Sequence, residues 1–130
     1  LLRNMQLDSL RDIGLSERKS KYIIGIADYF YSGGKDIDFY KLSNLEVYNE
    51  LITIKGIGPW TIDMFLMFTL GREDVLPVRD LGIQKGFQKA LSLNNLPSEE
   101  RMKKIASKWR PYRTIACWYL WAIVDDGFVW

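Results

Sequence analysis

The chain is 130 residues long, which fits a single domain with a core of its own, and its 48% hydrophobic and 26% charged residues are typical of a folded globular protein. With one cysteine and no histidine, it lacks the ligands for a zinc site or an iron–sulfur cluster and cannot form a Ser-His or Cys-His nucleophile pair. The net charge of +2 is compatible with a polyanionic partner but selects none. Carboxylates, lysines, tyrosines and serines therefore remain as candidate catalytic groups.

The apolar stretches are interrupted every few residues by charged side chains, so none approaches the roughly 20 residues that span a bilayer. Cys117 cannot form an internal disulfide, and no signal-peptide pattern opens the chain. We therefore expect a protein that does not enter membranes and works in a reducing compartment: cytoplasmic and nucleoid-associated, or nuclear in a eukaryote. The start at Leu1 rather than Met and the abrupt end at Trp130 indicate a piece of a longer protein.

Two helices are expected before residue 32. A short amphipathic turn covers residues 8–13, and Ser16 is well placed to cap a helix over residues 17–31. Apolar side chains fall on one side of the second helix at helical spacing, which is typical of core packing. They are Ile23, Ile24, Ala27, Phe30 and Tyr31.

The next helix has a clear start signal. Ser43 and Glu46 have the S-x-x-E spacing of a capping box, which predicts a helix over residues 44–54. Its inward side is expected to carry Leu45, Tyr48, Leu51 and Ile52. After a glycine-containing break, the apolar pattern of residues 61–70 predicts another helix.

Three further helices are expected, over residues 80–91, 99–109 and 112–124. Trp118 and Trp121 stand at helical spacing in the last one, which favours a core position for both over an exposed stacking platform. No strand, fixed repeat or low-complexity run is predicted. We therefore expect an all-α, compact, orthogonally packed helical domain over residues 1–130, without some N-terminal helices of a longer protein.

Residues 51–61 predict a helix, a tight hairpin and a second helix. Gly56 and Gly58 stand where the backbone turns sharply and is approached closely. Free amide groups and the positive dipole end at the start of the helix containing Thr61 make an anion site that ignores base identity, and Lys55 adds a charge. Glycine pairs also close ordinary helical turns, so the pattern alone leaves both interpretations open.

The hairpin, with Gly56, Ile57 and Gly58 at its centre, resembles the signature of the helix-hairpin-helix (HhH-GPD) DNA glycosylase superfamily. Three further blocks resemble that superfamily in the same order, at residues 14–23, 76–82 and 108–113, and together they most resemble 3-methyladenine DNA glycosylase II. The resemblance implies no cofactor apart from a monovalent cation, K⁺ or Na⁺, at the backbone of Ile54 and Gly56. It also implies a grip on a DNA phosphate by Lys55, Gly56, Ile57, Gly58 and Thr61.

In that superfamily a catalytic aspartate follows the hairpin by about one helix and one loop, and Asp80 is at the matching position. A fixed carboxylate stabilises the positive charge that develops on deoxyribose as the N-glycosidic bond breaks, and it can orient the attacking water. The structural alternative is that Asp80 only caps its helix. Asp63, within the helix after the hairpin, and Asp74, expected in a solvated loop, are rivals that match no motif.

Trp60 stands where bifunctional members of the superfamily carry a lysine whose amine attacks the sugar. The resemblance therefore implies a water nucleophile and a monofunctional enzyme. Trp60 is expected to line the base pocket, where its ring attracts positively charged alkylated purines, with a core position as the alternative. Arg79 can contact a phosphate or pair with an acid, and Arg113 can reach DNA or brace Asp80; both roles stay open.

The resemblance implies a DNA glycosylase that flips alkylated bases such as 3-methyladenine out of double-stranded DNA and excises them in base excision repair. The main alternative is a non-catalytic module that only grips the DNA backbone, and a protein-interaction scaffold is the third. Asp80 discriminates between the first two, because a gripping module has no use for a carboxylate there. We expect a monomer, with the wedge residue and the far wall of the pocket outside this chain.

Overall fold

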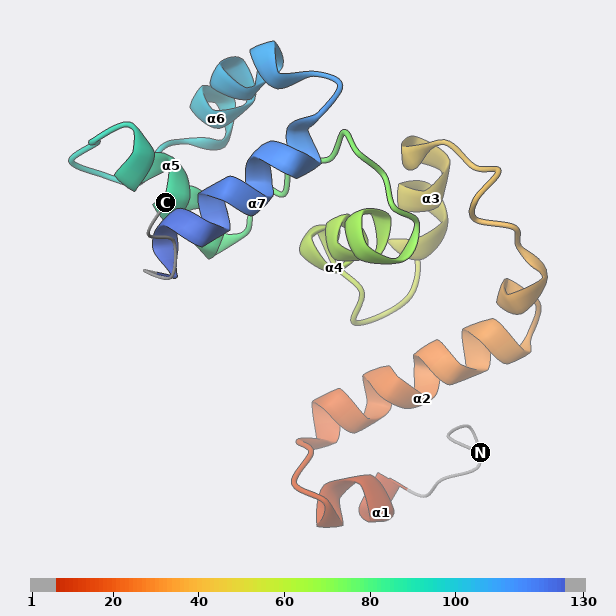
Figure 1. Ribbon diagram of the computed structural model, residues 1–130. Helices are drawn as coiled ribbons and strands as arrows, with labels where there is room; N and C mark the ends of the chain where they lie inside the picture. Colours follow the sequence, from red (N-terminus) through yellow and green to blue (C-terminus); the bar gives the residue numbers. More distant parts are fainter. Residues whose placement is uncertain (1–6, 126–130) are drawn as a thin grey trace. The chain divides into compact units, whose positions relative to one another are not determined.

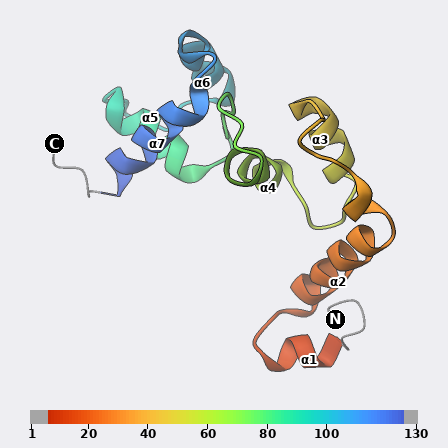
Figure 2. The ribbon, with the colours of Figure 1, turned by 45° about the vertical axis from the view of Figure 1, so that its right-hand side comes forward.

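The computed structural model describes residues 7–125, and the chain divides into two compact units, Leu1–Gly58 and Pro59–Trp130. Its described part consists of helices and loops without a strand (Figures 1 and 2), so the prediction of an all-α protein is confirmed. Within the same residues, no helix has the length and apolar character needed to cross a membrane. Leu1 and Trp130, which indicated a longer protein, lie outside the described residues.

The first unit contains α1 (Leu7–Asp12), α2 (Glu17–Tyr31), a 3₁₀ turn (Gly34–Asp36) and α3 (Asn44–Leu51). The Ser16 hydroxyl caps α2 by accepting a hydrogen bond from the Lys19 amide at 3.3 Å. At the start of α3, Ser43 and Glu46 form the complete capping box. Each cap satisfies amides that a helix start leaves free, so both helices begin where the sequence predicted.

The inward side of α3 differs from the prediction. Val47 and Leu51 are its buried residues, whereas Leu45 and Ile52 are 68% and 38% exposed. Positions 47 and 51 are one helical turn apart and share a face, and positions 45 and 52 lie on another face. The prediction is therefore right for Leu51, which is buried, and partly right for Tyr48, which is half-buried, but wrong for Leu45 and Ile52. It also missed Val47 and extended α3 past its end at Leu51.

The apolar side of α2 is only partly covered. Ile23, Ile24, Ala27 and Phe30 are half-buried, and Tyr31 is exposed, so the prediction of a core position for Tyr31 is wrong. A hydrogen bond from the Tyr29 hydroxyl to Glu50 Oε1, at 2.6 Å, ties α2 to α3. Burial together with this carboxylate raises the pKa of Tyr29 to about 12.

The second unit contains α4 (Pro59–Met64), a π-helical segment (Phe65–Thr69), α5 (Leu81–Ala90), α6 (Glu99–Ala106), a 3₁₀ turn (Ser107–Trp109) and α7 (Arg113–Val124). The helix predicted over residues 61–70 is therefore present, but it begins at Pro59 and continues from Phe65 as a π-helix. The Leu70 amide donates to the carbonyl of Phe65 at 3.0 Å, five residues back, which is the bond that defines a π-helix. α4 itself begins at Pro59, a residue that suits the first helical position.

Close packing of α5 against α7 forms the core of the second unit. Gly86 permits the close approach, since a Cβ there would lie 2.6 Å from the Leu120 carbonyl oxygen. Ile83 and Phe87 on α5 and Cys117 on α7 are fully buried in this unit. The first turn of α5, which follows Asp80, is therefore held by an extensive apolar contact rather than by a mobile loop.

The loop before α5 is fastened to the start of α7. Arg113 donates from Nε to Asp74 Oδ1 at 2.5 Å and from Nη2 to Asp74 Oδ2 at 2.9 Å. The Thr114 hydroxyl donates to the Arg72 carbonyl at 2.7 Å and accepts from the Val75 amide at 3.0 Å. The charged neighbours of Asp74 in sequence predicted a solvated loop, and this prediction is wrong, because Asp74 is paired with Arg113. Its hydrogen bond from Arg113 holds its pKa below the ordinary value.

Candidate active site

Asp80 lies at the N-cap of α5 with an extended backbone (φ −76°, ψ 122°). Its Oδ1 accepts a hydrogen bond from the Ile83 amide at 2.8 Å, which is the ordinary bond of a capping aspartate. Its own amide donates to the carbonyl of Pro77 at 2.9 Å, and Pro77 is fully buried. The capping role considered as the structural alternative is thus present, and it fixes the carboxylate at the end of a packed loop.

Two indole groups donate to the same carboxylate. Trp60 Nε1, from α4, donates to Asp80 Oδ2 at 2.7 Å, and Trp121 Nε1, from α7, donates to Oδ1 at 2.8 Å. These residues are 20 positions before and 41 positions after Asp80. A helix cap uses one carboxylate oxygen, whereas here both oxygens accept hydrogen bonds, so the arrangement exceeds what capping requires.

The hydrogen bonds determine the charge of this carboxylate. Burial, the largest influence, would raise the pKa of Asp80 because a low-dielectric surrounding disfavours the charged form. The bonds from Trp121, Trp60 and the backbone amides of Ile83 and Gly82 outweigh burial and hold the pKa below its ordinary value. Asp80 is therefore an anion at neutral pH, and its hydrogen-bond partners fix its orientation.

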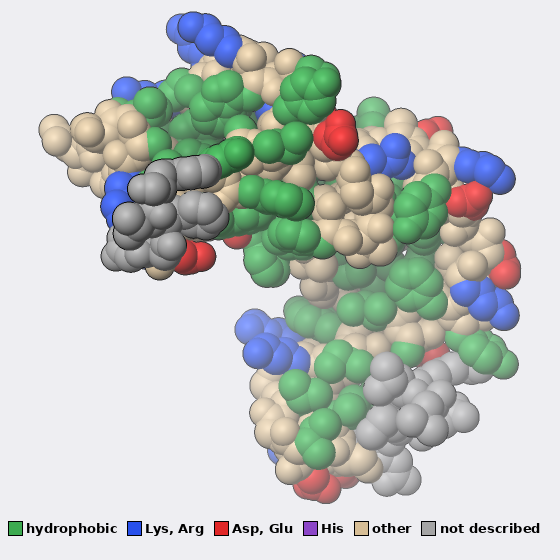
Figure 3. Space-filling model, in the orientation of Figure 1, with side chains coloured by type: hydrophobic (Ala, Val, Ile, Leu, Met, Phe, Trp, Pro, Cys, Tyr) green, Lys and Arg blue, Asp and Glu red, His purple; other side chains and the backbone are tan. Residues whose placement is uncertain are grey.

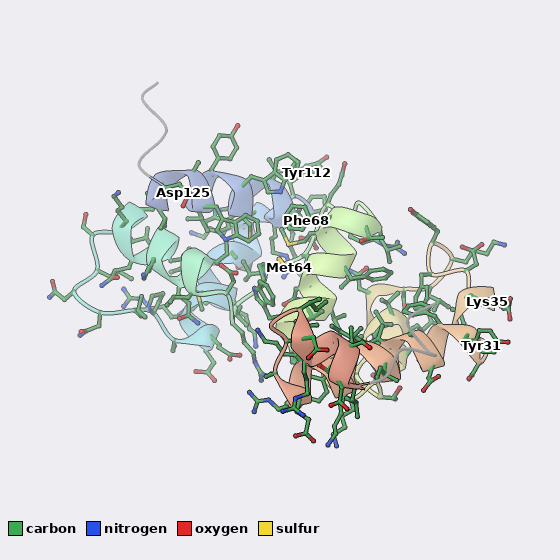
Figure 4. The ribbon with its side chains drawn as sticks, turned by 90° about the horizontal axis from the view of Figure 1, so that it is seen from below. Tyr31, Lys35, Met64, Phe68, Tyr112 and Asp125 are labelled. Atoms are coloured by element: carbon green, nitrogen blue, oxygen red, sulfur yellow. The ribbon has the colours of Figure 1, made fainter. Side chains whose placement is uncertain are left out.

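Of the aromatic residues beside Asp80, Trp60 and Phe68 are exposed and Trp121 is half-buried. Trp60 is 48% exposed, which excludes the core position considered for it. Phe68, labelled in Figure 4, is 60% exposed and stacks on Trp121 with ring centroids 6.0 Å apart and planes inclined by 26°. The space-filling view shows hydrophobic side chains gathered over α7 (Figure 3). A flat apolar group that approached the carboxylate would meet aromatic surface.

The hairpin turn belongs to the first unit as far as Gly58, and Thr61 lies in the first turns of α4 in the second. The Ile57 amide closes the turn by donating to the Ile54 carbonyl at 3.0 Å. Gly56 has φ +98°, a conformation that favours glycine, and a Cβ there would lie 2.3 Å from Cγ of Tyr22. Gly58 has no such restriction, and a Cβ there would meet nothing within 4 Å.

A basic hollow lies beside this turn, within the first unit. It has a volume of about 610 Å³ and is lined by Ser16, Glu17, Arg18, Lys21, Tyr22 and Lys55. Glu17 pairs with Lys21 through Lys21 Nζ at 2.5 Å, so Arg18 and Lys55 supply the excess positive charge. The predicted backbone-binding residue Lys55 thus has basic neighbours from α2, which the sequence analysis did not assign to binding.

Comparison with known proteins decides the family. Residues 2–111 match the HhH-GPD superfamily base excision DNA repair protein. The chain belongs to the HhH-GPD superfamily. DNA-3-methyladenine glycosylase 1 of Schizosaccharomyces pombe is 38% identical over 122 residues, which are 92% of this chain and 54% of that protein. The putative DNA-3-methyladenine glycosylase YfjP of Bacillus subtilis is 30% identical over 125 residues, 95% of this chain and 44% of that protein.

Solved structures support the same assignment. The structure of S. pombe 3-methyladenine DNA glycosylase Mag1 in complex with abasic DNA has a TM-score of 0.85 and 37% identity, covering 92% of this chain and 59% of that chain. A DNA-3-methyladenine glycosidase from Bacillus halodurans has a TM-score of 0.78 and 36% identity, covering 98% and 60%. This HhH-GPD chain thus spans about half the length of the relatives it matches.

Within the HhH-GPD chain, the structure brings together Asp80 and Trp60 and adds a residue that the sequence analysis placed in the core. Trp121 is half-buried and hydrogen-bonded to Asp80, and Trp118, also expected in the core, is 56% exposed. Spacing along α7 could not separate these roles, because the partner of Trp121 lies on α5. A signal was present only in the size of neighbouring residues, since Gly82 leaves room beside Asp80.

Of the remaining acidic and basic candidates, Arg79, Arg113 and Asp74 have other partners. Arg79 Nε lies 3.4 Å from Glu99 Oε1 in an exposed ion pair, which is the pairing considered for it. Arg113 binds Asp74. Asp63 is half-buried on α4, and burial raises its pKa to about 6 against the opposing charge of Arg79. Neither Asp63 nor Asp74 belongs to the Asp80 cluster, by which we mean Asp80 and its two indole donors, Trp60 and Trp121.

Proposed function

We propose that this HhH-GPD chain is the core of a monofunctional DNA glycosylase of the 3-methyladenine DNA glycosylase II type, which excises alkylated bases from double-stranded DNA. The observation that carries the proposal is the Asp80 carboxylate, which accepts hydrogen bonds at both oxygens from the exposed Trp60 and the half-buried Trp121. Relatives named DNA-3-methyladenine glycosylase and a neighbour bound to abasic DNA support it.

Asp80 would act by electrostatic stabilisation. Breaking an N-glycosidic bond places positive charge on the deoxyribose, and an oriented carboxylate attracts that charge as it develops. Opposite unit charges 4 Å apart attract by about 4 kcal/mol at an effective dielectric constant of about 20. If this attraction is gained only in the transition state, it corresponds to roughly a thousandfold in rate.

Trp60 would supply an aromatic wall for the flipped base. A positively charged alkylated purine is attracted to an indole face by about 0.5–2 kcal/mol, whereas a neutral normal base lacks this attraction. The hydrogen bond from Trp60 to Asp80 links this wall to the carboxylate. Base selection and bond cleavage would therefore take place at adjacent side chains.

The hairpin would hold the DNA backbone. Lys55, Gly56, Ile57, Gly58 and Thr61 would contact a phosphate through free amides and the lysine charge, which makes binding independent of base sequence and sensitive to salt. The carbonyl of Ile54 accepts one hydrogen bond, from Ile57, and a carbonyl oxygen has a second lone pair. Backbone carbonyls are ligands that monovalent cations accept, so Ile54 and Gly56 fit the cation site that the family resemblance implies.

The reaction product tests the monofunctional assignment. No lysine stands at position 60, so the sugar would be attacked by water and the product would be an abasic site in an intact strand. Borohydride should trap no covalent protein–DNA adduct from the full-length enzyme. An adduct that disappears when a lysine of this chain is replaced would contradict the assignment.

The decisive experiment compares Asp80→Asn with wild type in single-turnover release of 3-methyladenine from a duplex by the full-length protein. The amide keeps much of the capping ability but has no charge, so excision should fall by about a thousandfold while binding to lesion DNA persists. Asp125→Asn is the control, because Asp125 is an exposed carboxylate at the end of α7.

Release at the wild-type rate by Asp80→Asn would overturn the catalytic assignment. If wild type itself binds duplex DNA but releases no alkylated base, the chain is a gripping module rather than an enzyme.

A further inference from the structure

Gly82 stands in the first turn of α5, where a glycine has no backbone reason to be. Its φ is not positive, and glycine weakens a helix relative to alanine because it loses more conformational freedom on folding. The reason lies in the space beside it. A Cβ at position 82 would be 2.8 Å from Trp121 Cδ1 and 3.0 Å from both Trp121 Nε1 and Asp80 Oδ1.

The indole of Trp121 occupies that space and is held there from several sides. Its Nε1 donates to Asp80 Oδ1 at 2.8 Å, and Phe68 stacks on its ring. Its helix, α7, packs on α5 through the close contact at Gly86. The position of the N–H group relative to the carboxylate is therefore set by packing on α5, on α7 and on the π-helical segment.

We infer that Trp121 is a positioning residue for Asp80 and that Gly82 admits its indole to the carboxylate. This inference rests on the proposed function, because it assigns Asp80 the stabilisation of a cationic sugar. An indole N–H donates only and carries no charge, so it orients the carboxylate without cancelling the negative charge. The second unit also shows the opposite arrangement, in which Arg113 pairs with Asp74 and neutralises it.

A neutral donor can orient the Asp80 carboxylate and leave its negative charge uncompensated, which a cation could not do. A guanidinium against Asp80 would fix the carboxylate equally well but would repel the developing positive charge of the sugar. The Trp121 indole fixes the carboxylate and leaves its charge available. Glycine at position 82 permits this arrangement, because a Cβ there would lie too close to both the indole and Oδ1 for the two to keep their positions.

The first test is Trp121→Phe in the full-length protein, which keeps a ring for Phe68 and removes the donor. Single-turnover excision should fall by about tenfold, with binding to lesion DNA changed less than about twofold. The acid limb of the pH–rate profile should move to higher pH, because a carboxylate that loses a donor is protonated more readily.

The matched control is Trp109→Phe. Trp109 is also half-buried and also stacks on a phenylalanine, Phe87, with ring centroids 5.2 Å apart. It should lose a similar amount of stability without a shift of the acid limb. An unchanged acid limb in Trp121→Phe, or an equal shift in Trp109→Phe, would overturn the positioning role.

The second test addresses the space at position 82. Gly82→Ala should displace the indole and reproduce the slower excision and the shifted acid limb. Gly25→Ala on α2, where a Cβ would meet nothing within 4 Å, should change neither. The double variant Gly82→Ala/Trp121→Phe should be no slower than Trp121→Phe alone, because both changes remove the same hydrogen bond. Additive losses would contradict the assigned link.

A measurement without catalysis separates this inference from the proposed function. The carboxyl of Asp80 can be titrated by NMR in protein labelled with ¹³C-aspartate, with Asp80→Asn assigning the signal. Trp121→Phe and Gly82→Ala should both raise its pKa, and Trp109→Phe should not. If these shifts occur although Asp80→Asn excises normally, the positioning contact is correct and the catalytic assignment is wrong; if Asp80→Asn is inactive and no shift occurs, the reverse holds.

Discussion

The hairpin and the Asp80 cluster are built from different parts of the residue. The hairpin presents main-chain amides. Some of its positions must lack a side chain, as at Gly56, where a Cβ would overlap Tyr22. The Asp80 cluster consists of side chains that are far apart in sequence: Trp60 precedes Asp80 by 20 residues, and Trp121 follows it by 41. A site built from main-chain groups is formed by consecutive residues of the sequence. A site built from side chains depends on how the helices pack.

The largest effect is expected where the main chain has no freedom. Gly56→Ala places a side chain at φ +98° and against the Tyr22 ring, which should destabilise the protein by about 3 kcal/mol and weaken duplex binding for every sequence. Urea unfolding and fluorescence anisotropy measure the two effects. The control, Gly25→Ala, should raise stability by up to about 1 kcal/mol. A stable Gly56→Ala with normal binding would contradict the strict requirement.

A carboxylate with a structural role should behave unlike Asp80. Asp74→Asn leaves Arg113 without its partner in a largely buried pair and should lower the free energy of unfolding by about 2 kcal/mol. Because the pKa of Asp74 is lowered in the folded state, its contribution is present above an unfolded pKa of about 3.8 and is lost as the pH falls through the lower folded value.

The excision rate of folded Asp74→Asn should equal that of wild type. Urea unfolding at pH 7 and pH 3 and single-turnover excision at pH 7 test both statements. An Asp74→Asn variant that is stable but inactive would contradict the assignment of a structural role to Asp74 and a catalytic role to Asp80.

Gly58 sharpens the same comparison, because its surroundings in the folded protein are open. Gly58→Val should change stability little, since a Cβ there meets nothing within 4 Å, but it should weaken duplex binding about tenfold by blocking the close approach of a phosphate. Binding is measured over a range of salt concentrations and on several sequences. Unchanged affinity would remove Gly58 from the binding surface.

The smallest effect is expected at Asp63, the half-buried carboxylate without an assigned function. Burial raises its folded pKa to about 6, above the ordinary 3.8, so ionisation opposes folding as the pH rises through this range. Asp63→Asn should therefore stabilise the protein by about 1 kcal/mol at pH 7, after allowance for solvent screening, and by almost nothing at pH 3. Thermal melting at both pH values tests the sign, and destabilisation at pH 7 would reverse it.

The difference between contacts of residues close in sequence and contacts of residues far apart in sequence also decides what could be predicted from the sequence. Helix starts were predicted correctly at Ser16 and Ser43, because a cap is a contact between residues three positions apart. The hairpin and Asp80 could be located by their motif. The burial of Val47 on α3 and the partner of Trp121 could not, because each depends on elements that meet only in the folded chain. The π-helical bond at Leu70 was also missed, because apolar spacing predicts a helix without distinguishing its hydrogen-bond type.

Asp74 shows the same limit from another side. Its charged neighbours in sequence indicated a solvated loop, but its partner, Arg113, is 39 residues away at the start of α7. Charge density along the sequence reports which residues prefer water, and it does not report which of them find a partner. The correct interpretation required the packing of α7.

The burial of Cys117 affects how readily its thiol reacts with alkylating agents. Its thiol lies inside the α5–α7 packing, 3.9 Å from the Val75 carbonyl, and burial with the nearby Asp80 charge raises its pKa to about 12. At pH 7 this thiol is therefore less ionised than a free cysteine, and the thiolate is the form that reacts with electrophiles. Electrophiles that methylate DNA bases also methylate thiolates. The one cysteine of the chain is thus sheltered from the reagents whose damage the protein is proposed to repair.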